Sequence, residues 1–136
     1  MKDFSKLPDS MEPDELECCF FEFFKDANDL CDSKLLFVFK QLYELSFRQL
    51  YTYELLRKSI RERVSAFILN NLDYESFEIM DYVMHIIPLL GLDDVFNKII
   101  SDKHTIANFE VKNLIEKCKN DYGDNVSDPL FGFKQP

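Results

Sequence analysis

The side chains that could support acid–base, nucleophilic or metal chemistry are few in this sequence. His85 and His104 are its only imidazoles. His85 falls within an apolar run, as expected of a core or rim histidine whose hydrogen bonds are satisfied, and His104 has no acidic partner at a useful spacing. Acidic pairs such as Glu75 and Glu78 are common on solvated helix faces. No glycine-rich phosphate loop, G-x-S-x-G or H-E-x-x-H motif occurs in the chain.

The cysteines do not change this conclusion. Cys18, Cys19, Cys31 and Cys118 lack C-x-x-C spacing, and the adjacent pair cannot easily bridge to itself. We therefore expect four reduced thiols in a reducing intracellular compartment, either nuclear or cytoplasmic. Together these residues predict a non-enzymatic protein with no catalytic residue, no metal site and no cofactor.

Composition and charge indicate the class of partner. Of the 136 residues, 46% are hydrophobic and 14 are phenylalanine, so the chain can bury a substantial core. There is no apolar run of about 18 residues and no signal-peptide pattern, which predicts no membrane association. The net charge is −9, and only residues 33–71 are basic overall. Because phosphate contacts need clustered Lys and Arg, we expect protein partners and no direct nucleic-acid binding. The oligomeric state is left open.

The hydrophobic periodicity predicts an all-α fold, a compact bundle of about five to six helices. Residues 1–10 are expected to be a flexible leader, residues 11–121 the bundle domain, and residues 122–136 a disordered, flexible acidic tail. Whether residues 34–70 form one helix or two is not decided by the pattern. The predicted helices cover about 15–30, 33–45, 52–70, 73–90, 93–100 and 105–119, with Asp73 and Thr105 as candidate caps, and an end or kink at Pro88.

The pattern over residues 34–87 has a family resemblance. It reads K-L-L-F-V-F-K-Q-L-Y-E-L over residues 34–45, followed by E-L-L-R-K-S-I from Glu54 and then Val64. This resembles the N-terminal domain of transcription elongation factor TFIIS, which is also found in elongin A, the Mediator and the integrase-binding domain of lens-epithelium-derived growth factor. The resemblance implies a right-handed bundle of about five helices that acts as a scaffold and docks short motifs.

The C-terminal residues resemble the acidic [Phe/Leu]-x-Gly-Phe motifs that such domains bind. The candidate tail motif consists of Asp124, Asp128, Leu130, Phe131, Gly132 and Phe133. A glycine here lets the backbone turn so that two apolar side chains enter one pocket, while upstream acids meet a basic rim. A candidate basic rim on the bundle consists of Arg57, Lys58, Arg61 and Arg63. We expect the tail to bind in trans, although its phenylalanines could instead fold back onto the chain's own core.

Two other functions fit the same sequence. One is a small viral Bcl-2-like helical protein that binds host signalling or apoptosis factors. That fold requires a central helix buried on all sides, and residues 76–90 are the candidate for it. The other is an obligate helical subunit whose surplus phenylalanines are covered by a partner. The elongation-type scaffold instead requires Ile60 and Val64 in a short helix that faces residues 34–45.

Overall fold

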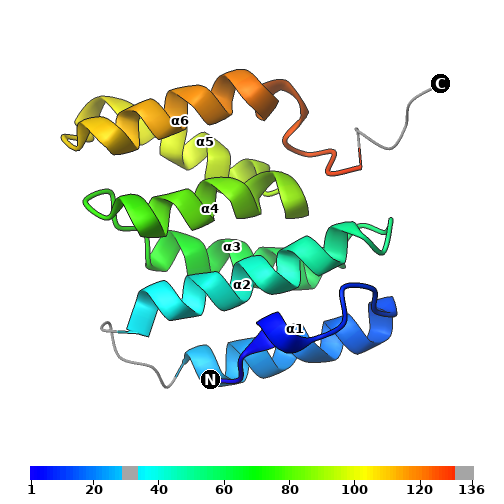
Figure 1. Ribbon diagram of the computed structural model, residues 1–136. Coiled ribbons are helices and arrows are strands. Elements are labelled where there is room, and N and C mark those ends of the chain that lie inside the picture. The colour runs from blue at the N-terminus through cyan, green and yellow to red at the C-terminus, as the bar shows by residue number, and fades with distance from the viewer. Residues whose placement is uncertain (29–33, 131–136) are drawn as a thin grey trace.

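The computed structural model describes residues 1–28 and 34–130, and within these ranges the chain contains helices and no strand. The α-helices are α1 (Pro13–Ala27), α2 (Leu35–Leu50), α3 (Lys58–Asn70), α4 (Phe77–Leu90), α5 (Asp93–Asp102) and α6 (Phe109–Tyr122). Short 3-10 segments accompany them, namely η1 (Phe4–Lys6), η3 (Lys103–Thr105) and η4 (Gly123–Asn125). The predicted all-α bundle of about six helices is confirmed (Figure 1), and α2 and α3 are separate helices.

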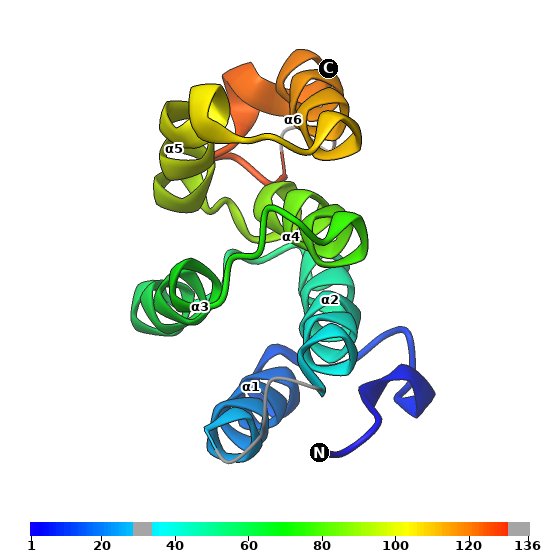
Figure 2. The same cartoon turned by 90° about the vertical axis from the view of Figure 1, so that its left-hand side faces the viewer.

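The helices form three antiparallel hairpins that stack on one another (Figure 1). Seen end-on, α2, α4 and α6 form one layer, and α1, α3 and α5 form a second row along one side of it (Figure 2). The central helix α4 packs against α2, α5 and α6. Each helix turns an apolar stripe towards its neighbours, so that one contiguous core runs through the stack.

Local backbone chemistry explains where the helices end. α2 ends at Leu50, and Tyr53, which has a left-handed φ of 58°, lies in the connection to α3. A helix cannot continue through such a residue, so α3 starts at Lys58, whereas the periodicity predicted a start near residue 52. The cap of α4 is Ser76 rather than Asp73, since the Ser76 hydroxyl accepts from the backbone N–H of Ile79. As predicted, α4 stops at a glycine, Gly91, whose φ of 72° gives a left-handed C-cap.

Pro88 lies inside α4 without ending it, and its effect is instead on hydrogen bonding. A proline has no N–H, so the carbonyl of Met84, four residues earlier, lacks its usual helical donor. The hydroxyl of Tyr122, at the end of α6, donates to this carbonyl at 2.6 Å. The proline thus creates an acceptor that ties the last helix to the central one.

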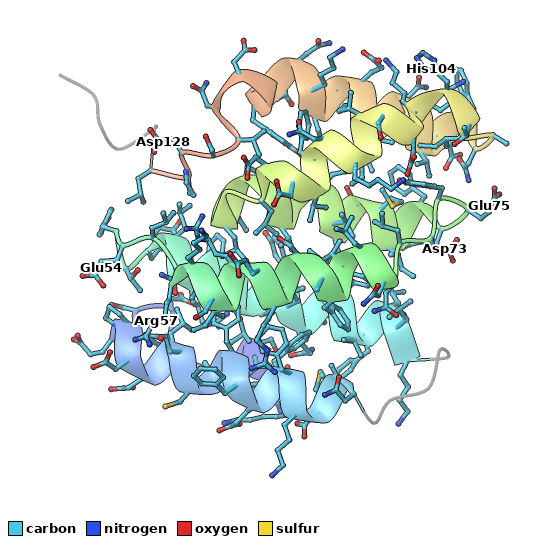
Figure 3. All side chains as sticks on the ribbon, turned by 180° about the vertical axis from the view of Figure 1, so that it is seen from behind. Glu54, Arg57, Asp73, Glu75, His104 and Asp128 are labelled. Atoms are coloured by element: carbon cyan, nitrogen blue, oxygen red, sulfur yellow. The ribbon has the colours of Figure 1, made fainter. Side chains whose placement is uncertain are left out.

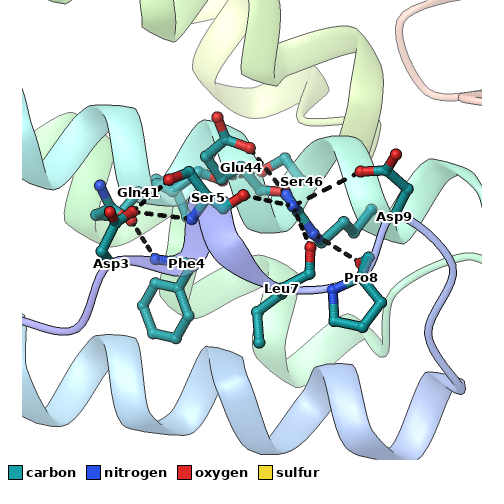
Figure 4. A network of polar contacts seen from close by, with 11 residues as sticks. Asp3, Phe4, Ser5, Leu7, Pro8, Asp9, Gln41, Glu44 and Ser46 are labelled. Carbon is teal, nitrogen blue, oxygen red and sulfur yellow. Dashed lines mark hydrogen bonds and ion pairs between the residues drawn. The ribbon is translucent and has the colours of Figure 1, made fainter.

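The first ten residues, expected to be a loose leader, pack against α2 instead. The Phe4 side chain is fully buried in the core, and its backbone N–H donates to Gln41 Oε1 at 2.6 Å. The guanidinium of Arg48, only 2% exposed, donates to the carbonyls of Leu7 at 2.9 Å and Pro8 at 3.0 Å (Figure 4). It also contacts Glu44 Oε2 at 2.8 Å. A buried arginine on α2 therefore holds the N-terminal segment in place.

The segment after α6 also packs against the bundle over its described part. Val126 is 5% exposed and belongs to the core. Pro129 lies over Gly91, where an added Cβ would be 3.0 Å from the proline ring. The prediction of a disordered tail from residue 122 therefore differs from the structure as far as residue 130, because an apolar residue and a ring-on-glycine contact anchor the segment. Residues 131–136 lie outside the described residues.

Candidate interaction surface

A row of aromatic side chains runs along the outer side of the α2–α4–α6 layer. It consists of Tyr43, Phe47 and Tyr51 on α2 and at its C-cap, together with Tyr82 on α4, and we call it the aromatic ladder. Neighbouring ring centroids are 6.3 Å apart for Tyr43 and Phe47, 4.8 Å for Phe47 and Tyr51, and 5.9 Å for Tyr43 and Tyr82. The spacing of four residues on α2 places its three rings on one helix face.

The ladder is accessible at its α2 end. Tyr51 is 44% exposed, and with Phe47 and Tyr53 it lines a cleft of about 340 Å³ whose other side is Asp9 and Ser10. Burial is the main cause that raises the pKa of the Tyr43 hydroxyl, so this hydroxyl stays protonated and can donate a hydrogen bond at neutral pH. Rigid aromatic rings with polar tips are typical of protein-binding surfaces.

A second concave feature, which we call the α4–α6 cleft, lies between α4 and α6. Its volume is about 480 Å³. Its apolar residues are Phe77, Leu114 and Cys118. Its polar residues are Asp81, His85, Glu110, Asn113, Lys117 and Asp121. The cleft and the ladder meet at α4, where Asp81 and Tyr82 are consecutive residues.

The cleft brings together a thiol, an imidazole and a carboxylate that the sequence did not pair. His85, expected as a core or rim residue, is exposed, and its Nδ1 is 2.6 Å from the carbonyl oxygen and 3.3 Å from Oδ1 of Asp81. Cys118 is buried; burial is the main cause that raises its pKa, with a partly opposing hydrogen bond to Tyr122. A nucleophilic thiol needs a lowered pKa and a base partner, so the geometry gives this constellation no activated nucleophile.

The remaining groups that could do chemistry are dispersed. His104 is exposed in η3, at the same end of the molecule as Asp73 and Glu75 (Figure 3). Cys18, Cys19 and Cys118 are free thiols, and Cys31 lies outside the described residues. In residues 1–28 and 34–130, no three His, Cys, Asp or Glu side chains are arranged to hold a metal ion.

The four residues of the candidate basic rim face different neighbours. Arg57 Nε lies 3.2 Å from Glu17 Oε1 on α1 (Figure 3), and the Arg63 guanidinium stacks 4.3 Å from the ring centroid of Phe24, also on α1. Lys58 and Arg61 instead line a small cleft with the start of α5. The rim is thus divided, because Arg57 and Arg63 contact α1 whereas Lys58 and Arg61 lie beside the start of α5.

The structure describes only the first half of the candidate tail motif. Asp124 is exposed, and Asp128 and Leu130 are partly buried. Asp128 lies at the same end of the molecule as Glu54 and Arg57 (Figure 3). Phe131, Gly132 and Phe133 lie outside the described residues, so the trans-binding hypothesis stays a prediction.

One further cleft, of about 450 Å³, lies between α1, α2 and α3 and contains Phe24, Arg63 and Phe67. Asn28 and Leu35 form its edge, directly before and after the residues that the structure does not describe. We therefore assign no function to it.

Comparisons with protein-family models, with curated proteins and with solved structures give no significant match for this chain. Among the helices of the described ranges, none combines the length and the apolar character needed to cross a membrane.

Proposed function

We propose that this protein is a non-enzymatic protein–protein interaction adaptor that binds its partner on the outer face of the α2–α4–α6 layer. The observation that carries the proposal is the aromatic ladder, whose Tyr51 is 44% exposed and meets Phe47 edge-to-face with ring centroids 4.8 Å apart. Clustered, accessible aromatic side chains supply much of the binding energy at protein interfaces. The exposed part of the Tyr51 ring contributes no burial to the folded monomer, whereas a bound partner would remove it from water.

The chemistry of the described residues supports a binding role over catalysis. The thiol in the α4–α6 cleft has a raised pKa, and its hydrogen-bond partner is Tyr122 rather than the imidazole of His85. The only tight imidazole–carboxylate contact, among described residues, is between neighbours one turn apart on α4. Such a pair is a common feature of helix surfaces.

The elongation-type scaffold and the Bcl-2-like protein make different demands on helices α3 and α4. Ile60 and Val64 lie on the buried face of α3, and Phe67 of the same helix contacts Phe39 of α2 at 5.5 Å between ring centroids, which supports the elongation-type scaffold. Helix α4 exposes Glu78 and His85, which does not suit the fully buried central helix of a Bcl-2-like protein. We therefore keep the transcription-elongation-type scaffold as the finer proposal.

The test is a quantitative co-purification that compares two matched substitutions of exposed aromatic residues. Tyr51→Ala removes a ladder ring, whereas Phe21→Ala removes a ring of similar exposure, 48%, from α1. We expect Tyr51→Ala to reduce partner recovery about tenfold or more, as for a ring at the centre of an interface. Phe21→Ala should leave recovery unchanged. Equal recovery with both variants would refute a binding role for the ladder.

A further inference from the structure

We propose that the α4–α6 cleft binds a basic amphipathic helix of a partner protein. The proposal rests on the adaptor function and specifies the chemical class of the partner.

The charges around the cleft select a positively charged ligand. Three carboxylates line it, from Asp81 on α4 and from Glu110 and Asp121 on α6, against the single ammonium of Lys117. Glu110 and Asp121 are exposed and are not held in any ion pair among the described residues. Complementary charges at a rim guide association and exclude ligands of like charge.

The floor of the cleft is apolar. Phe77 and Leu114 are partly buried and pack against the core, and Cys118 is 6% exposed. A ligand that presents apolar side chains to this floor and basic side chains to the carboxylates would satisfy both parts of the surface. Such a ligand is amphipathic with a basic polar face.

The walls favour a helix over an extended peptide. Both walls are α-helices whose backbone groups bond within the helix, and the described residues contain no strand edge that an extended peptide could extend. A helical ligand satisfies its own backbone and packs between α4 and α6 by its side chains. Glu110 and Asp121 are eleven residues apart on α6, which corresponds to about 16 Å, or three turns of a bound helix. We expect basic residues about eleven positions apart on the ligand.

Two synthetic 15-residue peptides test the proposal on the full chain. Both carry the same leucine stripe, with lysine at the polar positions of one and glutamate at those of the other, and binding is measured by fluorescence anisotropy. In a first variant, Asp81→Asn, Glu110→Gln and Asp121→Asn are combined. A matched control removes three exposed carboxylates elsewhere by Glu15→Gln, Glu54→Gln and Asp94→Asn. Both variants therefore have the same net charge.

We expect the lysine peptide to bind the cleft variant about tenfold more weakly than the unmodified chain, because each lost rim charge contributes about a factor of two. The control variant should stay within about twofold. A second variant, Asn113→Arg, places a bulky cation in the cleft from an exposed position and should abolish binding without affecting the fold. Equal weakening by both triple variants would show attraction to net charge alone and overturn the proposal, as would equal binding of the glutamate peptide.

The failure of this proposal can be distinguished from the failure of the adaptor function. If Tyr51→Ala reduces partner recovery while the cleft variants bind the lysine peptide normally, the adaptor function stands and the cleft proposal is wrong. If the cleft variants lose the peptide while Tyr51→Ala leaves partner recovery unchanged, the cleft proposal stands and the ladder is not the partner site.

Discussion

The hydrogen bond from Tyr122 to the carbonyl of Met84 should depend on the proline at position 88. In a regular helix the N–H of residue 88 would bond to that carbonyl, and Pro88 has no N–H to offer. Tyr122 supplies the missing donor at 2.6 Å. Burial raises the pKa of its hydroxyl, so the hydroxyl stays protonated and remains a donor around neutral pH. Tyr122→Phe should therefore leave a buried carbonyl without a partner.

The cost in folding free energy depends on whether the Met84 carbonyl keeps a hydrogen-bond donor. An unsatisfied buried acceptor costs about 1–3 kcal/mol, so we expect Tyr122→Phe to reduce the free energy of unfolding by about 2 kcal/mol. In a Pro88→Ala background, the N–H of the alanine can bond to the Met84 carbonyl, and the same substitution should cost under about 1 kcal/mol. The coupling between the two positions should be at least about 1 kcal/mol. The thiol–hydroxyl contact between Cys118 and Tyr122 is lost in both backgrounds and cancels.

Urea denaturation followed by circular dichroism on the four proteins of this double-mutant cycle measures the coupling. Tyr74→Phe is the matched control, because the hydroxyl of Tyr74 donates to Asp102 Oδ2 at 2.7 Å and not to α4. Its cost should be the same with proline or alanine at position 88. If the effects of Tyr122→Phe and Pro88→Ala add to within about 0.5 kcal/mol, the reasoning is refuted.

Three other predictions concern separate parts of the molecule. Arg48→Met should lower the free energy of unfolding by about 3 kcal/mol, since buried carbonyls lose their charged donor. It should also expose the amides of residues 4–8 to hydrogen exchange, and retained protection of these amides would contradict this. Hydrogen bonds from Lys98 and Tyr74 lower the pKa of Asp102, so this carboxylate stabilises the fold above about pH 4 and its contribution is lost as the pH falls through its folded pKa. The stability difference between the unmodified chain and Asp102→Asn, measured by thermal melts, should therefore shrink between about pH 5 and pH 3, and a constant difference would exclude the linkage. Phe133→Ala should remove the partners of the tail motif in a pull-down read by mass spectrometry, and unchanged partners would refute the trans hypothesis.

Much of the fold was predictable because its cause is local. The repeat of apolar residues at spacings of three and four indicates helices wherever it continues, and the left-handed glycine at Gly91 ends α4 where the pattern indicated. The start of α3 was misplaced by about six residues. A tyrosine with a positive φ, Tyr53, is rare, and no sequence rule anticipates it.

The two ends of the chain were harder to predict because their order depends on distant residues. The Phe4 side chain packs into the core, and hydrogen bonds to Gln41 and Arg48, about forty residues away, hold the backbone of the segment around it. Val126 is buried by the same kind of long-range packing. The composition of a terminal segment with few apolar residues predicts disorder, because the residues that stabilise the segment lie elsewhere in the sequence.

The candidate interaction surface shows the same division. The four-residue spacing of Tyr43, Phe47 and Tyr51 was visible in the sequence and could have indicated an aromatic face on one helix. That Tyr82 of α4 extends this face, with its ring 5.9 Å from Tyr43, depends on how two helices pack.

By itself, the sequence determined the helical class, the acidic charge and the scarcity of catalytic groups, because these properties follow from residue types and local periodicity. Only the tertiary structure decided which carboxylates share a cleft with Phe77 and Leu114, since Asp81 of α4 and Glu110 of α6 are 29 positions apart in the sequence. It also decided that two of the four basic rim residues contact α1 while the other two lie beside the start of α5. Surfaces are built from residues that are neighbours in space, and their contents depend on how the helices pack.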